Sequence, residues 1–308
     1  MTTQPPPTQI LPARSPGRAV VTVLVVAALA VALVAAAGNP RFEWDVVFHY
    51  FLSSQILEGL GTTLLLTLIS MVAGILIGVL LAIMSLSGVP IVRALSAGYI
   101  WLFRGVPLLV QLIFWFNMSA LFPAIGLGLP GTPLWLELNA NELVTPFVAA
   151  VLALSLNEGA YMAEIVRAGL LSVGKGQSEA AYSIGMSKTR TMLRVVLPQS
   201  MRIIIPPTGN QTIGMLKTTS LVSVIAVTDL LYSTQLISST TFKTIPLLIT
   251  ASLWYLLVTS VLSIGQHYLE REFSKGSTRD GRPTAGSRVA TITRTLSVVV
   301  QPTKKRRA

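Results

Sequence analysis

Four ionisable side chains interrupt stretches of the chain that are otherwise apolar: Arg104, Glu158, Glu164 and Lys217. A charged group at the centre of a bilayer costs about 2.5–3.5 kcal/mol on insertion scales, so such side chains usually face a cavity or a partner. Glu164 can pair with Arg167, one helical turn away, and Arg104, near the end of its stretch, can snorkel to the interface. Glu158 has no partner in its own stretch, and Lys217 lies near the middle of another. We therefore expect Glu158 and Lys217 to face a cavity or a partner.

Residues 169–176 (Gly-Leu-Leu-Ser-Val-Gly-Lys-Gly) come close to a nucleotide-binding loop. That loop needs Ser or Thr after its Lys to hold Mg²⁺, and a strand before its first Gly. Here Gly176 follows Lys175, and a long apolar stretch precedes Gly169. Nucleotide binding by this chain is therefore not expected, and the energy for any active process must come from another chain or an ion gradient.

The composition argues against an ordinary soluble protein. The chain is 52% hydrophobic and 11% charged, whereas a soluble domain carries about 25% charged residues. It has no Cys, so disulfides and thiolate metal sites cannot form, and His49 and His267 lie far apart in the sequence. We expect no metal site, no catalytic His and no cofactor bound by this chain.

The apolar stretches predict an all-α membrane protein with about six spans. A transmembrane helix needs about 20 apolar residues, and its backbone groups must pair within the segment because hydrocarbon offers no partner. The candidates are Ala19–Ala37, Gly59–Leu86, Tyr99–Phe122, Leu143–Val166, Ile203–Val227 and Pro246–Leu269. The first could instead be a signal peptide, with Ala35, Ala36 and Ala37 as a cleavage site, but its apolar run exceeds the usual length of about 7–15 residues. An anchor is the better interpretation.

The basic residues predict the orientation of these spans. With the N-terminus in the cytoplasm, the inner segments hold nearly all Lys and Arg side chains, and the outer segments hold only Arg41 and Lys243. Most of the loop acids then lie outside: Glu43, Asp45, Glu137, Glu142 and Asp229. The net charge of +11 therefore reflects the orientation of the chain in the membrane, with the basic residues beside anionic lipids. Nucleic acid is not an expected partner.

Three segments outside the spans are predicted to be loops or tails. Residues 1–18, rich in Pro, Thr and Gln, are typical of a disordered cytoplasmic leader. Residues 269–308 form a basic cytoplasmic tail that can lie near anionic lipid. The outer segment 123–142 is punctuated by Gly and Pro, with Trp135 as an interfacial anchor.

The segment 167–202 is too long for a tight turn between two spans. Its centre, Glu179–Ala181, is Ala-rich, with Ser178 before it as an N-cap and Gly185 after it as a stop, which predicts a short helix. Pro198 then predicts a break before the next span. A short helix at the inner face of the membrane, with an acid and small residues exposed, can fit a cleft on a partner protein and transmit a movement of that partner.

This segment resembles the permeases of ATP-binding cassette importers. Their pattern is Glu-Ala-Ala, three residues, Gly, nine residues, Ile, any residue, Leu-Pro. The corresponding residues here are Glu179, Ala180, Ala181, Gly185, Val195 in place of Ile, Leu197 and Pro198. Other stretches resemble the polar amino acid branch, namely 61–64 (Gly-Thr-Thr-Leu), 103–111 (Phe-Arg-Gly-Val-Pro-Leu-Leu-Val-Gln), 160–167 (Ala-Tyr-Met-Ala-Glu-Ile-Val-Arg) and 216–221 (Leu-Lys-Thr-Thr-Ser-Leu). Val106 and Thr218 depart from the branch, which usually has Thr and an acid or Asn there.

The resemblance covers roughly residues 57–268, a five-span type I permease core, with 19–37 as an extra N-terminal helix. It implies a short cytoplasmic coupling helix and import of a polar amino acid such as glutamate, glutamine, histidine or arginine across the inner membrane. It implies no enzymatic activity of this chain, with ATP and Mg²⁺ on a separate pair of ATPase subunits. Further implied partners are a second permease, identical or paralogous, and an extracytoplasmic amino-acid-binding protein.

A zwitterionic substrate needs an acceptor for its ammonium group and a donor for its carboxylate. Glu158 and Lys217, with Tyr161 and Asn210, can supply both, and our hypothesis is that they line the pathway. Arg104 and Gln111 are further candidates.

Two alternatives stay open at this point. A gradient-driven amino acid carrier would predict inverted repeats and broken spans in matching positions, and the sequence shows neither. A non-transporting membrane scaffold, with the basic tail as its recruitment arm, leaves the 167–202 pattern and the charges within the spans unexplained.

Overall fold

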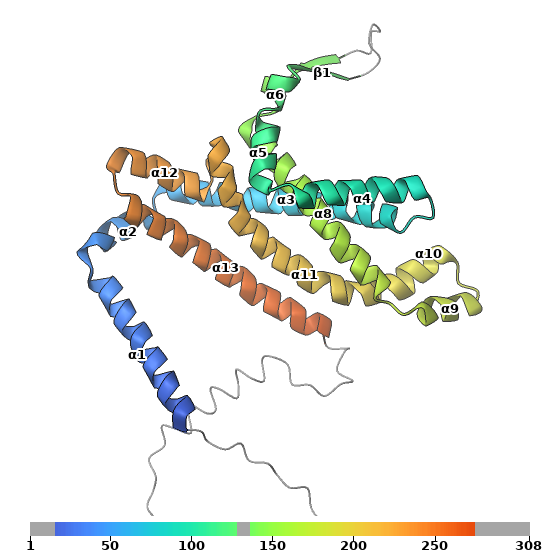
Figure 1. Ribbon diagram of the computed structural model, residues 1–308, viewed down its shortest axis with the longest axis horizontal. Coiled ribbons are helices and arrows are strands. Elements are labelled where there is room, and N and C mark those ends of the chain that lie inside the picture. Colours follow the sequence, from blue (N-terminus) through green and yellow to red (C-terminus); the bar gives the residue numbers. More distant parts are fainter. Residues whose placement is uncertain (1–15, 128–135, 275–308) are drawn as a thin grey trace, which may run out of the picture.

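A computed structural model describes residues 16–127 and 136–274 (Figure 1). The chain begins with α1 (Pro16–Gly38), η1 (Pro40–Phe42), α2 (Trp44–Phe51), α3 (Ser54–Ser85), α4 (Pro90–Gly105), α5 (Leu108–Phe116) and α6 (Met118–Leu121). The strands β1 (Ala124–Leu127) and β2 (Leu136–Asn139) follow, then α7 (Ala140–Leu143), α8 (Pro146–Leu171), α9 (Lys175–Ser183) and α10 (Lys188–Thr191). A π-helical turn η2 (Met192–Val196) leads into α11 (Leu197–Thr218), η3 (Thr219–Ile225), α12 (Leu230–Thr241) and α13 (Thr244–Ser274).

The predicted all-α membrane architecture is confirmed. Within residues 16–127 and 136–274, four single helices are long and apolar enough to cross a membrane: α1, α3, α8 and α13. Two bent pairs bring the number to six if each pair counts as one span: α4 with α5, bent by 99°, and Lys188–Ile225 with α12, bent by 44°.

The third predicted span, Tyr99–Phe122, is wrong as a single straight helix. The apolar stretch divides at Val106 and Pro107, between α4 and α5. Proline has no N–H to donate and disfavours helical geometry in the residue before it. Hydropathy could not reveal the break because both halves are apolar.

The segment 167–202, expected to connect two spans, is mostly helical. α8 continues to Leu171, and one helix then runs from Lys188 to Ile225. The predicted break at Pro198 is wrong, because the preceding turn widens instead: the N–H of Leu197 donates to the carbonyl of Met192, five residues back. Pro198 then lies in the first turn of α11, directly after this widened turn.

The segment predicted to lie outside contains a small antiparallel ribbon in which Ala124 pairs with Asn139 and Leu127 with Leu136. Trp135, the predicted anchor, lies outside the described residues, as do residues 1–15 of the predicted leader and 275–308 of the predicted tail. α13 runs to Ser274, so the first residues of the predicted tail are helical.

The centre of the bundle is the crossing of α3 and α8, where glycines let the two backbones approach. A Cβ added to Gly74 would lie 2.8 Å from the Cβ of Glu158, and one added to Gly78 would lie 2.9 Å from the backbone N of Ala163. Gly159 faces Ile77 in the opposite direction. Gly74 and Gly78 thus serve a close helix contact within the chain.

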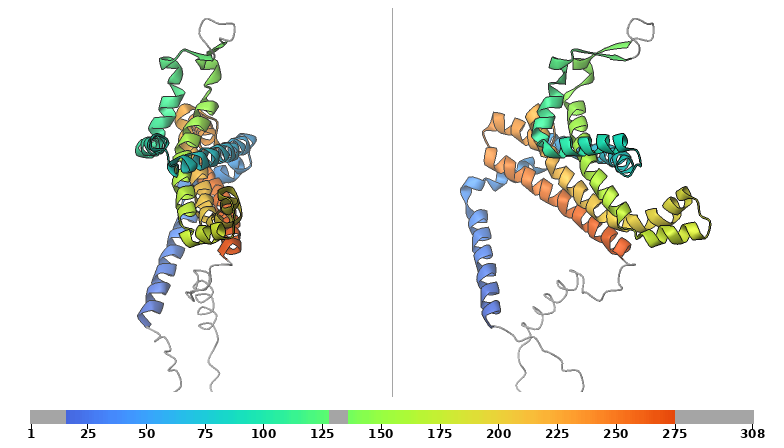
Figure 2. Two further views of the ribbon diagram at one scale, coloured as in Figure 1. Left: turned by 90° about the vertical axis from the view of Figure 1, so that its right-hand side faces the viewer. Right: turned by 45° about the vertical axis from the view of Figure 1, so that its right-hand side comes forward.

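The helices form a flat layer, seen edge-on in Figure 2, left. The main buried cluster includes Leu66 of α3, Leu112 of α5, Leu154 of α8 and Val222 of η3. Large apolar side chains on the outer faces of α3, α4 and α13 stay exposed, and α1 stands apart from the bundle (Figure 2). Exposed apolar surface of this extent requires lipid or another membrane subunit to cover it.

The α3–α8 crossing predicts a position-specific effect of one methyl group. Gly78→Ala must push α8 away, because backbone atoms of Met162 and Ala163 meet the new Cβ, and overpacking of this kind costs about 1–3 kcal/mol. Gly61→Ala on the same helix is the control, since nothing lies within 4 Å of its Cβ position. Thermal unfolding of the detergent-solubilised protein should show a lower midpoint for Gly78→Ala alone. Equal midpoints for the two variants would contradict the close crossing.

Candidate functional site

A buried carboxylate lies where α3, α8 and α11 meet. Glu158 of α8 is only 5% exposed, and its Oε1 accepts a hydrogen bond of 3.3 Å from Nε2 of Gln211 on α11. Gly74 of α3 makes room for the side chain, because any larger residue there would meet its Cβ. The sequence found no partner for Glu158 within its own helix, and the structure supplies one from another helix.

Two further polar groups lie one turn from this carboxylate on the facing helices. Ser155 precedes Glu158 by three residues on α8, and Ser70 precedes Gly74 by four on α3. Both hydroxyls are buried and have no hydrogen-bond partner within residues 16–127 and 136–274. Buried polar groups are usually paired, so these two hydroxyls are exceptions at the α3–α8 crossing.

Arg104 and Tyr161 come together at the edge of this region. The guanidinium carbon of Arg104, in the last turn of α4, lies 5.2 Å from the ring centroid of Tyr161 on α8. This distance fits a cation–π interaction. Both side chains are exposed, so they lie on the surface of the isolated chain, one helical turn from Glu158.

Gln111 stabilises the break between α4 and α5. The carbonyl of Phe103 would receive the N–H of residue 107 in an unbroken helix, but Pro107 has none. Nε2 of Gln111 donates to the carbonyls of Phe103 and Val106 at 3.0 and 2.8 Å, and Nδ2 of Asn157 donates to Phe103 at 2.7 Å. The amide of Gln111 thus has a structural role at the break, which sequence analysis did not foresee.

Two predicted pathway residues do not join Glu158. Asn210 and Lys217, both on α11, are exposed. No ion pair links Lys217 to Glu158 in residues 16–127 and 136–274. The predicted pairing of Glu164 with Arg167 is confirmed at 2.9 Å.

The predicted short helix before α11 is present as α9. It begins at Lys175 after Gly174, so the expected N-cap at Ser178 is wrong: Ser178 lies inside the helix. Gly185 has a φ of +82°, and backbone bonds run from Gly185 to Tyr182 and from Met186 to Ala181. This pair of bonds is the Schellman arrangement, which requires the left-handed conformation that glycine adopts at low cost.

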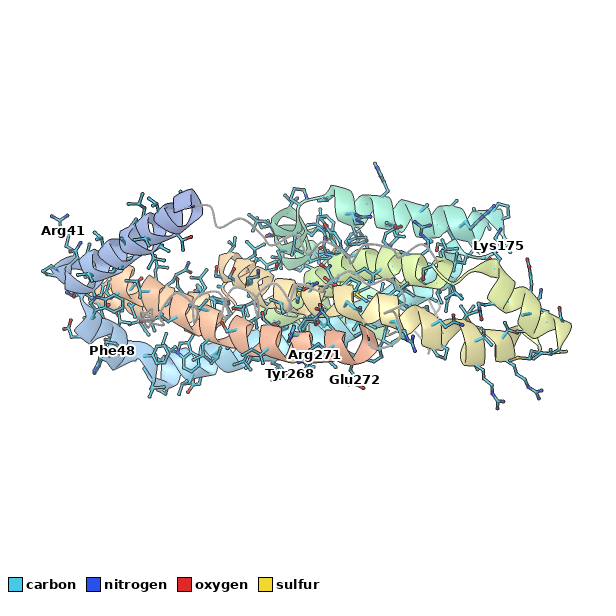
Figure 3. All side chains as sticks on the ribbon, turned by 90° about the horizontal axis from the view of Figure 1, so that it is seen from below. Arg41, Phe48, Lys175, Tyr268, Arg271 and Glu272 are labelled. Carbon is cyan, nitrogen blue, oxygen red and sulfur yellow. The ribbon has the colours of Figure 1, made fainter. Side chains whose placement is uncertain are left out.

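α9 and α10 project from the ends of α8 and α11, opposite α2 and α12 (Figure 1). Figure 3 shows Lys175 at this end, far from Arg41 and Phe48. Glu179 and Ala180 are exposed, whereas Ala181 is buried, and α9 packs against η2 just before Leu197 and Pro198. The projection therefore presents an acid and a small side chain outward and is continuous with α11.

The residues that the structure describes contain no group of three or more His, Asp or Glu side chains placed to hold a metal ion.

Comparisons with known proteins agree with this architecture. Residues 74–275 match the family described as binding-protein-dependent transport system inner membrane component. The arginine transport system permease protein ArgU of Corynebacterium glutamicum is 44% identical over 280 residues, covering 90% of this chain and 87% of that protein. The probable glutamine ABC transporter permease protein GlnM of Bacillus subtilis is 35% identical, covering 75% of this chain and 98% of that protein.

Among solved structures, that of an amino acid ABC transporter with histidines matches with a TM-score of 0.60. It is 35% identical and the match covers 71% of this chain and 94% of that one. The resemblance to the amino acid branch of importer permeases is thereby confirmed. The chain belongs to the family of inner membrane components of binding-protein-dependent transport systems.

Proposed function

We propose that this chain is the membrane-spanning permease subunit of an ATP-driven importer for a polar amino acid. The proposal depends on one observation: α11 continues from the projecting α9–α10 segment and carries Gln211, whose side chain donates a hydrogen bond to Glu158. One continuous helix thus links a surface suited to docking with a buried polar site. A movement imposed at the surface can pass along this helix toward that site.

In this proposal, the coupling segment is formed by Glu179, Ala180, Ala181, Gly185, Leu197 and Pro198. ATP and Mg²⁺ bind to a separate pair of ATPase subunits, and α9 docks on one of them. Closure of the ATPase pair moves α9, and α11 carries the movement to the pathway, which opens alternately to the two sides of the inner membrane. The N- and C-termini lie in the cytoplasm, on the side of the basic segments.

A second permease, identical or paralogous, completes the pathway, and a binding protein outside the membrane delivers the substrate. The flat layer of helices and its exposed apolar faces support this part of the proposal. Arg104, Tyr161, Asn210 and Lys217 are exposed in the single chain, so a second subunit can enclose them with Glu158 and Gln111 around one pathway.

The buried carboxylate favours a substrate that carries a positive group. Glu158 can accept hydrogen bonds from an ammonium or guanidinium group, and such charge-assisted bonds are stronger than neutral ones. The 44% identical relative is named as an arginine permease. We therefore infer a preference for arginine or a similar cationic amino acid over glutamate.

Neutralising the carboxylate should reduce uptake. Glu158→Gln keeps the size of the side chain but removes the charge, and uptake of labelled arginine into cells should fall by about 10-fold or more, as loss of a charge-assisted bond implies. Glu164→Gln on the same helix is the matched control, since Glu164 already pairs with Arg167. Lys217→Met should also change uptake. Complex assembly should persist in all three variants, and unchanged uptake in both Glu158→Gln and Lys217→Met would refute the pathway assignment.

The docking surface can be tested by co-purification from mild detergent. The wild-type chain should bring down an ATPase with a nucleotide-binding loop, together with a second permease. The double variant Glu179→Lys/Gly185→Val should lose the ATPase, because it reverses the exposed charge and strains the position with φ +82°. Gly174→Ala, at a glycine with φ −57°, should retain it. Purification of the wild-type chain alone, under conditions that keep a control importer intact, would overturn the importer assignment.

A further inference from the structure

α11 lacks helical hydrogen bonds at one place between Gln211 and the α9–α10 segment, which is proposed to dock on the ATPase. Pro206 and Pro207 lie inside the helix, and neither can donate to the carbonyl four residues earlier. Two successive helical hydrogen bonds, to the carbonyls of Arg202 and Ile203, are therefore missing. A helix that lacks adjacent bonds bends there more easily than elsewhere.

The side chain of Gln266 on α13 packs against α11 at these prolines. Its side chain is only 8% exposed, and Nε2 donates to the carbonyl of Pro206 at 2.7 Å and to Oε1 of Glu270 at 2.8 Å. The carboxamide lies over Gly209, where a Cβ would overlap it. Gly209 therefore admits the side chain of Gln266 to the backbone of α11.

α11 is held on both sides of this contact by α8. Before the prolines, Ile204 packs on Gly169, where a Cβ would lie 2.9 Å from Cδ1 of Ile204. After them, Gln211 reaches Glu158. The prolines thus divide α11 into a lower half, joined to α9–α10, and an upper half, joined to the buried carboxylate. Gln266 makes a polar contact with the proline pair between the two halves.

We propose that Gln266 is a positioning residue that fixes α11 against α13 at Pro206 and makes this contact the pivot between the docking segment and Gln211. The proposal rests on the proposed importer function. With the pivot fixed, displacement of the lower half of α11 must rotate the upper half. Without it, the proline pair absorbs the displacement and the carboxylate site does not respond.

The test uses the complete importer complex in proteoliposomes and measures substrate transported per ATP hydrolysed. Gln266→Met keeps the length of the side chain but loses both hydrogen bonds, to Pro206 and to Glu270. Loss of the bond to Pro206 should lower the transported amount per ATP by about three- to tenfold. Assembly and ATP hydrolysis should be retained. Ser252→Ala, at an exposed position on the same helix, should leave the ratio unchanged.

A second pair of variants tests the contact itself. Gly209→Ala should lower the same ratio because its methyl group displaces the carboxamide of Gln266. In Gly209→Ala/Gln266→Ala the clash is gone, so the double variant should perform no worse than Gln266→Ala alone. Such non-additivity is the mark of a direct contact.

The outcomes separate the two proposals. Wild-type complexes without ATP-driven uptake would overturn the proposed function. Wild-type complexes that transport, with an unchanged ratio in Gln266→Met or additive losses in the double variant, would overturn the pivot alone. Loss of assembly in both Gln266→Met and Gly209→Ala would also overturn it, since the contact would then serve only folding.

Discussion

Prolines inside apolar helices remove backbone donors that hydrocarbon cannot replace, and much of this structure follows from how the chain compensates. At Pro107 the helix divides, and the amides of Gln111 and Asn157 take over the carbonyl of Phe103. At Pro198 the chain stays helical because the turn before it widens. At Pro206 and Pro207 the helix continues without the two lost bonds, and Gln266 of α13 donates to the carbonyl of Pro206 beside them. Each of the three sites thus uses a polar side chain or an altered turn at a defined place.

These compensations also position the groups that we assign to transport. The break at Pro107 turns α5 away from α4 by 99°, which leaves Arg104 at the end of α4 beside Tyr161. The intact helix through Pro198 joins the projecting segment to α11 and so to Glu158. The glycines of α3 and α8 then admit the carboxylate to the centre of the bundle, because side chains at Gly74 and Gly78 would force the helices apart.

The sequence predicted what depends on composition and local spacing. Long apolar runs identified α1, α3, α8 and α13, and Gly185 correctly marked the end of α9 because a left-handed residue there has a local cause. It failed where partners come from distant segments. Asp229, expected in an outer loop, is fully buried, caps α12 through Tyr232 and accepts a bond from Tyr255 on α13.

The same limit applies to the candidate site. Glu158 could be singled out as a charge in an apolar run, but its partner Gln211 lies 53 residues away, and no spacing rule connects them. Gln111 was selected as a pathway residue because it is polar in a span, yet its amide is committed to the backbone of α4. The Glu164–Arg167 pair was predictable because helical geometry alone brings residues three apart together.

The central claim is that the projection at α9 touches an ATPase, and the absence of Cys from the sequence permits a direct test. The Ala180→Cys variant can carry a short photoreactive cross-linker in native membranes. The control is Phe242→Cys, an exposed residue that caps the C-terminal end of α12, and α12 lies at the end of the molecule opposite α9 (Figure 1). Our account predicts that Ala180→Cys captures an ATPase subunit and that Phe242→Cys does not. If membranes active in uptake give no ATPase product from Ala180→Cys, or the same product from both variants, the account is contradicted.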